Sequence, residues 1–199
     1  MNHRQLAEMQ DGGRRARPSR SREVMQRRIA IILISLVSLA ASATAPARAD
    51  GSLSFSVGPA IMFQSAARQI GGTTQLNVGA GYDFGGVKPL PFRSSVVFDY
   101  ASGSANGGSL TDWGLGLGGR LTTPTYLGAS AFLYNVNANQ GPIIGSRSAT
   151  GFGSNIFVGE KLISIPGGAS IGAQVTYRQL PTVNGIDASG LGFALRASL

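Results

Sequence analysis

The chain has 199 residues, a formal net charge of +8 and no cysteine, and its length suggests one domain plus an additional segment. The lack of cysteine excludes disulfides, Cys-ligated metals and a lipid anchor on cysteine. Charged residues make up only 13% of the chain and Gly occurs 29 times, a composition that fits poorly with a water-soluble globular protein.

Most of the positive charge lies near the N-terminus. Residues 1–49 contain nine of the 17 Lys and Arg residues but only three of the nine acidic ones. The rest of the chain has no basic cluster interleaved with aromatic residues, so we do not expect nucleic-acid binding.

The first predicted element is a secretory signal peptide. Arg27-Arg28 ends a basic segment, Ile29–Ala41 is apolar, and Ala47-Arg48-Ala49 precedes Asp50. A basic end, a short apolar stretch and an A-x-A site are its three parts, and the stretch is short for crossing ~30 Å of hydrocarbon. We expect cleavage between Ala49 and Asp50. Residues 1–49 are then an N-terminal extension with a cleavable signal peptide, and residues 50–199 are the mature domain.

Several alternatives for this segment stay open. Cleavage after Ala43-Thr44-Ala45 is one, and an uncleaved membrane anchor is another. Arg27-Arg28 could also direct twin-arginine export. Translation could start at Met1, Met9 or Met25, of which Met25 gives a compact signal peptide with an ordinary basic end.

From Asp50 onward, apolar side chains recur with the period of two that is typical of β-strands. In Thr74–Phe84, for example, Leu76, Val78 and Tyr82 share one face. The pattern predicts eight strands of about ten residues, a length that crosses a bilayer when the strand is tilted. They cover Leu53–Met62, Thr74–Phe84, Phe92–Tyr100, Asp112–Leu121, Thr125–Tyr134, Phe152–Glu160, Ile171–Arg178 and Leu191–Leu199. Thr125–Tyr134 is apolar on both faces, so its inward face is not predicted.

The connections between these strands alternate strictly in length. Residues 85–90, 122–124 and 164–168 form short turns, and residues 64–73, 101–110, 135–149 and 179–189 form longer polar loops. Short periplasmic turns and longer outer loops are typical of outer-membrane barrels. An even strand number puts both ends of the domain on the periplasmic side.

The composition of the two strand faces predicts which one lies inside. A soluble barrel, the alternative, needs a charged exterior, but the polar face is mainly Gly, Ala, Ser, Thr, Asn and Gln. Small residues suit the crowded lumen of an eight-stranded barrel, and the apolar face suits lipid. Aromatic residues near strand ends predict two interfacial girdles. They are Tyr82, Phe84, Phe92 and Tyr126 at the periplasmic boundary, and Phe98, Tyr100, Trp113, Phe152 and Tyr177 at the outer one.

A signal peptide, eight alternating strands and a hydrophobic last residue, Leu199, make the chain similar to small bacterial outer-membrane β-barrel families. It resembles the transmembrane domain of outer membrane protein A and the opacity-type and porin-like barrels over Asp50 to Leu199. Their final strand usually ends in Phe or Trp. The resemblance implies an all-β fold, an eight-stranded antiparallel up-and-down transmembrane barrel in the outer membrane. The implied partners are outer-membrane lipid, lipopolysaccharide, and the export and barrel-assembly machinery.

No catalytic or metal site is expected in the mature domain, and no cofactor. Some barrels of this architecture are lipid A-modifying enzymes with a His base and a Ser nucleophile, but the single His here is His3, in the leader. Asp99, Asp112 and Asp187 lie near outer strand ends or loops and could form a carboxylate pair. An oxygen-ligated Ca²⁺ in the loops also stays open.

Four charged residues on the polar faces predict an ion-pair network at the periplasmic end of the lumen. Asp83 ends the second strand, Arg93 begins the third, Arg120 ends the fourth and Arg196 lies near the end of the eighth. Charges in a narrow lumen are partly desolvated and need partners. We therefore expect Asp83 to pair with Arg93 or Arg120 and to help close the barrel to ions. The alternative is that these residues are solvated beyond the membrane.

Three non-enzymatic functions fit these predictions. The first is a structural barrel with a filled lumen, the second a surface-interaction protein such as an adhesin, and the third a small porin-like pore. The narrow lumen argues against a wide channel. An extracellular ligand would bind through loops 64–73, 101–110, 135–149 and 179–189.

Overall fold

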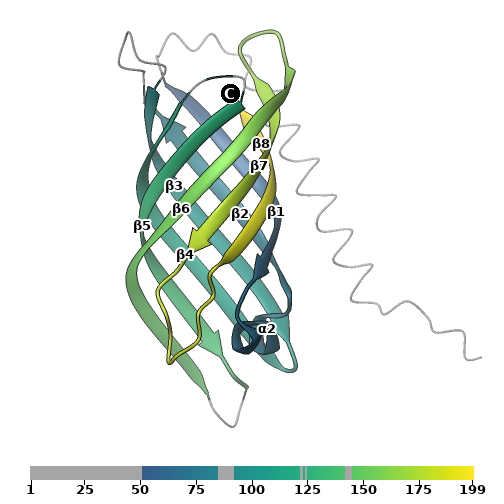
Figure 1. Ribbon diagram of the computed structural model, residues 1–199, viewed down its shortest axis with the longest axis vertical. Coiled ribbons are helices and arrows are strands. Elements are labelled where there is room, and N and C mark those ends of the chain that lie inside the picture. Colours follow the sequence, from purple (N-terminus) through teal and green to yellow (C-terminus); the bar gives the residue numbers. More distant parts are fainter. Residues whose placement is uncertain (1–50, 85–91, 122, 124, 142–144) are drawn as a thin grey trace, which may run out of the picture. The chain divides into compact units, whose positions relative to one another are not determined.

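The protein forms a closed antiparallel β-barrel of eight strands (Figure 1). This computed structural model describes residues 51–84, 92–121, 123, 125–141 and 145–199. Within them, a helix, α2 (Ser65–Gly71), follows the first strand. The strands are β1 (Ser52–Met62), β2 (Thr74–Asp83), β3 (Phe92–Ala105), β4 (Gly108–Leu121), β5 (Thr125–Asn139), β6 (Ser146–Ser164), β7 (Ser170–Gln179) and β8 (Gly190–Ser198).

Each strand pairs with its neighbours in the chain, and β8 pairs with β1 to close the ring. The predicted all-β, eight-stranded up-and-down fold is therefore confirmed. The start of β1 and the end of β8 lie at the same end of the barrel, which we call the terminal end. Helix α2 and the β3–β4 hairpin lie at the opposite end, the loop end (Figure 1).

The strand faces point as the alternation predicts. On β4, Trp113, Leu115 and Leu117 are 48, 57 and 69% exposed on the outside, whereas Asp112, which directly precedes Trp113, is fully buried in the lumen. Every strand contributes exposed apolar side chains to this outer surface, including Leu53, Tyr82, Phe98, Leu133, Ile156, Val175 and Phe193. The barrel thus presents a continuous apolar exterior around a polar interior.

Strand β5, whose inward face was not predicted, turns its large aromatic residues into the lumen. Tyr126, Phe132 and Tyr134 are buried, while Leu127 and Leu133 face outward. The prediction that Tyr126 belongs to an interfacial girdle is therefore wrong. The rings fit inside because small residues face them on the neighbouring strands. A Cβ added to Gly159 would lie 2.4 Å from the Tyr126 ring.

Two of the predicted long loops are mostly strand. Residues 101–110 contain only a two-residue turn, Asn106-Gly107, with φ of 50° and 77°. Positive φ at both positions gives a turn whose twist matches that of paired strands, and Asn-Gly favours it. Residues 135–149 likewise belong mainly to β5 and β6, which continue to Asn139 and from Ser146. The lengths of these two loops were overestimated.

The other two connections fold over the loop end of the lumen. Helix α2 contributes Ala67, and residues 180–189 contribute Leu180, Val183 and Ile186, to a buried apolar cluster with strand residues such as Leu110. The amide of Gln64 links the two connections, because its Nε2 donates to Gly185 O (3.0 Å) and its Oε1 accepts from Asp187 N (2.6 Å). This apolar cap covers the lumen at the loop end.

The contact between β1 and β8 is interrupted. Pairing runs from Ser54↔Ser198 to Val57↔Leu195 and resumes at Ala60↔Gly192, whereas the β1–β2 register continues without a break. The gap contains Gly58 and Pro59, and proline has no N–H to donate to a neighbouring strand. Near the terminal end, Leu199 N donates to Leu53 O (2.8 Å), and Arg196 Nη2 donates to Ser54 Oγ (2.9 Å).

Candidate functional site

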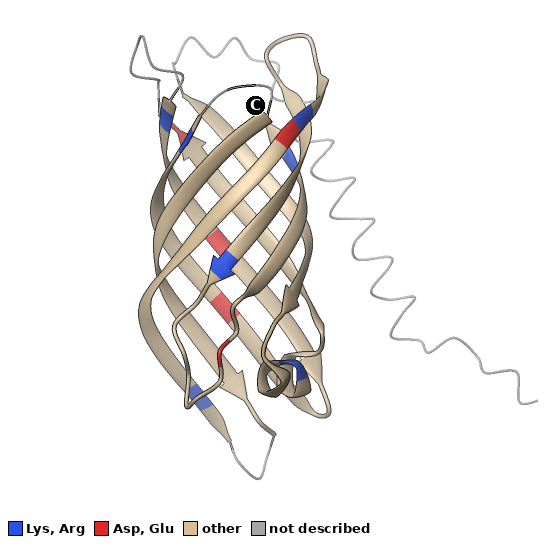
Figure 2. Cartoon of the chain, in the orientation of Figure 1, with Lys and Arg blue, Asp and Glu red and all other residues tan. Residues whose placement is uncertain are grey.

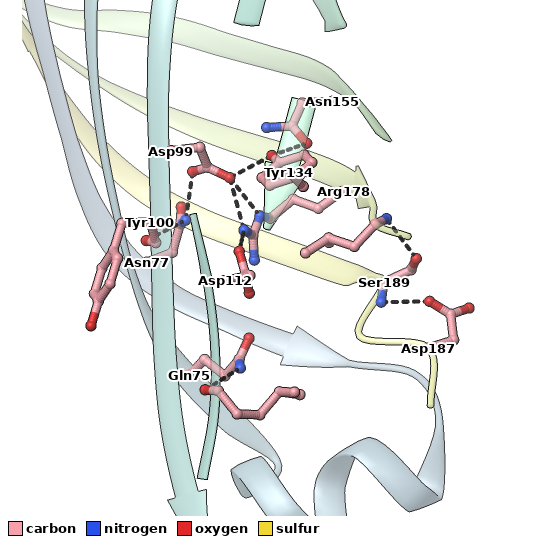
Figure 3. Close-up of polar contacts among 12 residues, drawn as sticks. Gln75, Asn77, Asp99, Tyr100, Asp112, Tyr134, Asn155, Arg178, Asp187 and Ser189 are labelled. Atoms are coloured by element: carbon pink, nitrogen blue, oxygen red, sulfur yellow. Dashed lines mark hydrogen bonds and ion pairs between the residues drawn. The ribbon is translucent and has the colours of Figure 1, made fainter. Parts of the chain in front are cut away.

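Buried charged residues occupy two levels of the lumen. Figure 2 shows charged positions on the strands both near the terminal end and in the middle of the barrel. The level nearer the loop end is formed by Arg178, Asp99, Asp112, Asn77, Tyr134 and Asn155, and we call it the Arg178 layer (Figure 3). The level nearer the terminal end is formed by Asp83, Arg120, Arg196 and Tyr126, and we call it the Asp83 layer.

The Arg178 guanidinium crosses the lumen from β7 to β3 and β4. Its Nε and Nη2 donate to Asp99 Oδ2 at 3.1 and 2.8 Å, and Nη2 also pairs with Asp112 Oδ1. All three side chains are almost completely buried, with exposures of 1% for Arg178, 6% for Asp99 and 0% for Asp112. Buried charges are tolerated when they are paired and hydrogen-bonded, and this arrangement provides both.

Two neutral side chains donate further hydrogen bonds to the Asp99 carboxylate. Asn77 Nδ2 donates to Asp99 Oδ1 (2.7 Å), and the Tyr134 hydroxyl donates to Asp99 Oδ2 (2.7 Å). The same hydroxyl lies 3.1 Å from Asn155 Oδ1. The Arg178 layer therefore connects six consecutive strands, β2 to β7. It carries two carboxylates and one cation, so its formal charge is −1.

Asp99, Asp112 and Asp187 are the residues that the sequence offers for a carboxylate pair. The structure brings Asp99 and Asp112 to the same guanidinium, whereas Asp187 lies in the loop after β7 and accepts from Ser189 N (2.8 Å). The sequence does not predict Arg178 as the partner of these carboxylates. Alternation with the outward-facing Tyr177 indicates only that Arg178 faces the lumen.

In the Asp83 layer, the structure brings Asp83, Arg120 and Arg196 together. Asp83 Oδ2 pairs with Arg120 Nη2 and lies 3.7 Å from Arg196 Nη2. The two guanidinium groups flank the Tyr126 ring, at 5.5 and 5.6 Å from its centroid. Cations near an aromatic face are attracted to its quadrupole, so the ring helps to hold two like charges at one level.

Arg93 does not reach Asp83 directly. Arg93 Nη1 donates to Ser52 Oγ (3.4 Å), and Ser52 Oγ in turn donates to Asp83 Oδ2 (3.3 Å). Asp83 itself is 1% exposed, so it is neither solvated nor lipid-facing. Arg196 Nη1 also donates to Gln174 Oε1 (3.2 Å), which extends the layer to β7.

Little empty space remains between the two layers. The cavity lined by Asp99 on one side and by Asp83, Arg120 and Arg196 on the other has a volume of about 60 Å³. Together with the apolar cap, the layers place side chains across the lumen at three levels. A second hollow, of about 230 Å³, lies at the terminal end against Arg93, Arg120 and Arg196.

Within the described ranges, no group of three or more His, Cys, Asp or Glu side chains is arranged to hold a metal ion. None of the helices in this part of the chain is long and apolar enough to cross a membrane. The predicted cleavage residues Ala47, Ala49 and Asp50 lie outside the described residues, as does His3.

A closed ring of eight antiparallel strands with an apolar exterior and a polar lumen is the fold of the small outer-membrane β-barrels. Among solved structures, the chain is similar to Neisserial surface protein A (NspA), at a TM-score of 0.55 and 15% identity, over 75% of this chain and 96% of NspA. It also aligns with the N-terminal β-barrel domain of Pseudomonas aeruginosa OprF, at a TM-score of 0.42 and 14% identity, over 74% of this chain and 95% of that domain. The similarity to NspA agrees with the fold that the sequence resemblance implied. No family model and no curated protein matches the chain.

Proposed function

We propose that this protein is a non-enzymatic barrel of the outer membrane with a closed lumen and a structural role in the cell envelope. The observation that carries the proposal is the combination of an apolar exterior on all eight strands with a lumen blocked by the Arg178 and Asp83 layers. An apolar surface of this extent needs lipid around it. A lumen crossed by paired side chains leaves no wide path for solutes.

The proposed orientation follows the geometry of the connections. The terminal end faces the periplasm, and the loop end, with α2 and the extended hairpins, faces outward. Outer-membrane lipid, lipopolysaccharide, and the export and barrel-assembly machinery are the partners that this location implies. Export through the cleavable signal peptide, which with the N-terminal extension makes up residues 1–49, is part of the same proposal.

The chemistry of the lumen supports a non-enzymatic role. A general base needs a proton-accepting group that is free to act. Asp99 already accepts hydrogen bonds from three side chains, and Asp112 is fully buried against Arg178. Among the described residues, no His lies in the lumen to activate a Ser nucleophile.

Surface interaction through the loop end is the second candidate. A cleft of about 480 Å³ lies there between α2, the β3–β4 hairpin and Gln140, with Gln69, Ile70 and Asn106 among its walls. NspA is itself described as a surface protein. Replacing Gln69 and Asn106 by Ala and measuring cell binding tests this candidate.

Two measurements test the main proposal. The protein from the membrane fraction should migrate faster on a denaturing gel before boiling than after it, because a folded barrel stays compact. In planar bilayers it should give no stable conductance steps. A soluble fraction containing all of the folded protein would contradict the membrane assignment, and regular steps would favour the porin-like alternative.

The Asp83 layer gives a further prediction. Asp83→Asn leaves Arg120 and Arg196 without their carboxylate, so we expect the free energy of unfolding to fall by about 1.5–3 kcal/mol, the range for hydrogen bonds to charged groups. We also expect ion leakage across vesicle membranes to rise. Urea titration followed by the fluorescence of Trp113, the single tryptophan, measures the first effect. Glu160→Gln, at an exposed site on β6, is the matched control. An Asp83→Asn variant equal to the parent in both stability and leakage would contradict a closing role.

A further inference from the structure

The hollow at the terminal end of the lumen carries an excess of positive charge. Four basic side chains line it, Arg93, Arg120, Lys161 and Arg196, and its volume is about 230 Å³. They come from β3, β4, β6 and β8, so strands distant in sequence converge on one space. We call this space the terminal pocket.

The acidic groups nearby do not balance these charges. Asp83 is engaged by Arg120 and Arg196, and Leu199, which also lines the pocket, adds a main-chain carboxylate if the chain ends there. Even with both counted, two negative charges face four positive ones. In the described part of the chain, Arg93 and Lys161 form no ion pair within 4.0 Å.

The same region contains buried donors without an acceptor. Within the residues that the structure describes, the buried Nε atoms of Arg120 and Arg196 and the Tyr126 hydroxyl have no hydrogen-bond partner, and Asp83 Oδ1 is the one buried acceptor of the Asp83 layer without a donor. These three side chains all line the terminal pocket. A ligand with negative charge and several acceptor oxygens would neutralise the excess positive charge and accept hydrogen bonds from the unpaired donors.

We propose that the terminal pocket binds a phosphate group, either of a soluble phosphate or of a phospholipid headgroup. Phosphate has the acceptor geometry that guanidinium groups recognise in pairs. Arg93 and Lys161 are the recognition residues, because they are the two cations not committed to Asp83. The site lies at the terminal end of the barrel and does not involve the loop end. It adds ligand binding to the structural role proposed above.

The experiment uses protein purified from membranes of cells that express the full chain, held in maltoside micelles, which contain no phosphate. Inorganic phosphate is titrated calorimetrically against a background of constant ionic strength set with chloride. We expect saturable binding at one site. The Arg93→Gln/Lys161→Gln double variant should weaken it by about ten-fold or more, since it removes two charge-assisted contacts. Both side chains lie outside the Asp83 ion pairs, so the barrel should still fold.

Arg147→Gln is the matched control, because Arg147 is an exposed cation at the other end of β6 and its loss changes net charge without touching the pocket. Its affinity for phosphate should equal that of the parent. Titrating glycerol phosphate and phosphatidylglycerol into the same micelles identifies the source. Binding of inorganic phosphate or of glycerol phosphate supports a soluble ligand, and binding of phosphatidylglycerol alone supports a lipid headgroup. No saturable binding of any of the three compounds, or equal weakening by the control and the double variant, would overturn the proposal.

Discussion

Replacing Arg178 by Met is expected to lower the free energy of unfolding by about 3–5 kcal/mol, the range for breaking a buried ion pair by removing one partner. Arg178 is the only cation that contacts Asp99 and Asp112 among the described residues. Its loss leaves two buried carboxylates side by side with no positive charge. Met keeps the unbranched stem of the side chain, so the effect reports mainly the loss of the guanidinium group. Urea titration in vesicles, followed by Trp113 fluorescence, measures it.

The two carboxylates give the control for this prediction. Asp112→Asn should cost little, because it removes the excess negative charge of the layer and Asp112 makes only the contact to Arg178. Asp99→Asn should cost more, since Asp99 accepts from Asn77, Tyr134 and Arg178. The triple variant Arg178→Met/Asp99→Asn/Asp112→Asn should recover part of the lost stability. A single Arg178→Met variant as stable as the parent would show that the layer contributes nothing.

Introducing Arg at Leu117 is expected to destabilise the membrane-inserted barrel by about 2–4 kcal/mol, the cost of a basic side chain near the bilayer midplane. Leu117 is 69% exposed on the outer face of β4, midway between Trp113 and Leu121. Val78, on the outer face of β2 opposite Val57, should respond similarly to Arg. Equilibrium folding into vesicles of defined thickness measures both effects.

Gln174→Ala is the matched lumenal change. It removes the acceptor of Arg196 and a contact to Thr176, which together should cost about 1 kcal/mol. The informative quantity is the loss of folding free energy caused by Leu117→Arg compared with the loss caused by Gln174→Ala. If Leu117→Arg and Gln174→Ala cost the same, the outer face is not immersed in lipid and the membrane assignment fails.

The positions of the strands and the outward side of most of them could be predicted from the sequence, because the two faces of a strand differ in composition. In alternating runs such as Leu76 to Phe84, the apolar face predicts the outward side of the strand, and the structure confirms that prediction. Strand β5 could not be oriented, because Phe132 and Leu133 are both large and apolar. What distinguishes them is the space on the lumenal side of the adjacent strand β4, where Gly116 is paired with Phe132 and leaves room for its ring. Such space depends on neighbouring strands and is invisible within one strand's own pattern. The Asn106-Gly107 pair was a local signal for a tight hairpin and was overlooked.

Of the two charged layers of the lumen, one could be predicted from the sequence and the other could not. Asp83, Arg120 and Arg196 could be predicted to share a level because each lies near a strand end at the same side of the barrel. Arg178 meets Asp99 and Asp112 in mid-lumen, between strands that are not hydrogen-bonded to each other. That contact depends on the tilt and stagger of all intervening strands. Strand-by-strand alternation contains no information about either quantity, so the Arg178 layer could not be assembled from sequence.

The interrupted contact between β1 and β8 bears on the order in which the barrel assembles. Seven of the eight strand contacts join consecutive strands, whereas β1 must meet a strand more than a hundred residues away. Contacts between distant segments cost the most chain entropy and form late. The ring therefore closes last at its least regular contact, where Gly58 and Pro59 reduce the backbone pairing. Arg196 crosses that junction to Ser54 and points toward Asp83 on β2. The contacts of Arg196 with Ser54 and Asp83 can therefore form only after β8 has paired with β1. The buried charges of the lumen thus stabilise the closed ring and not the open sheet that precedes it.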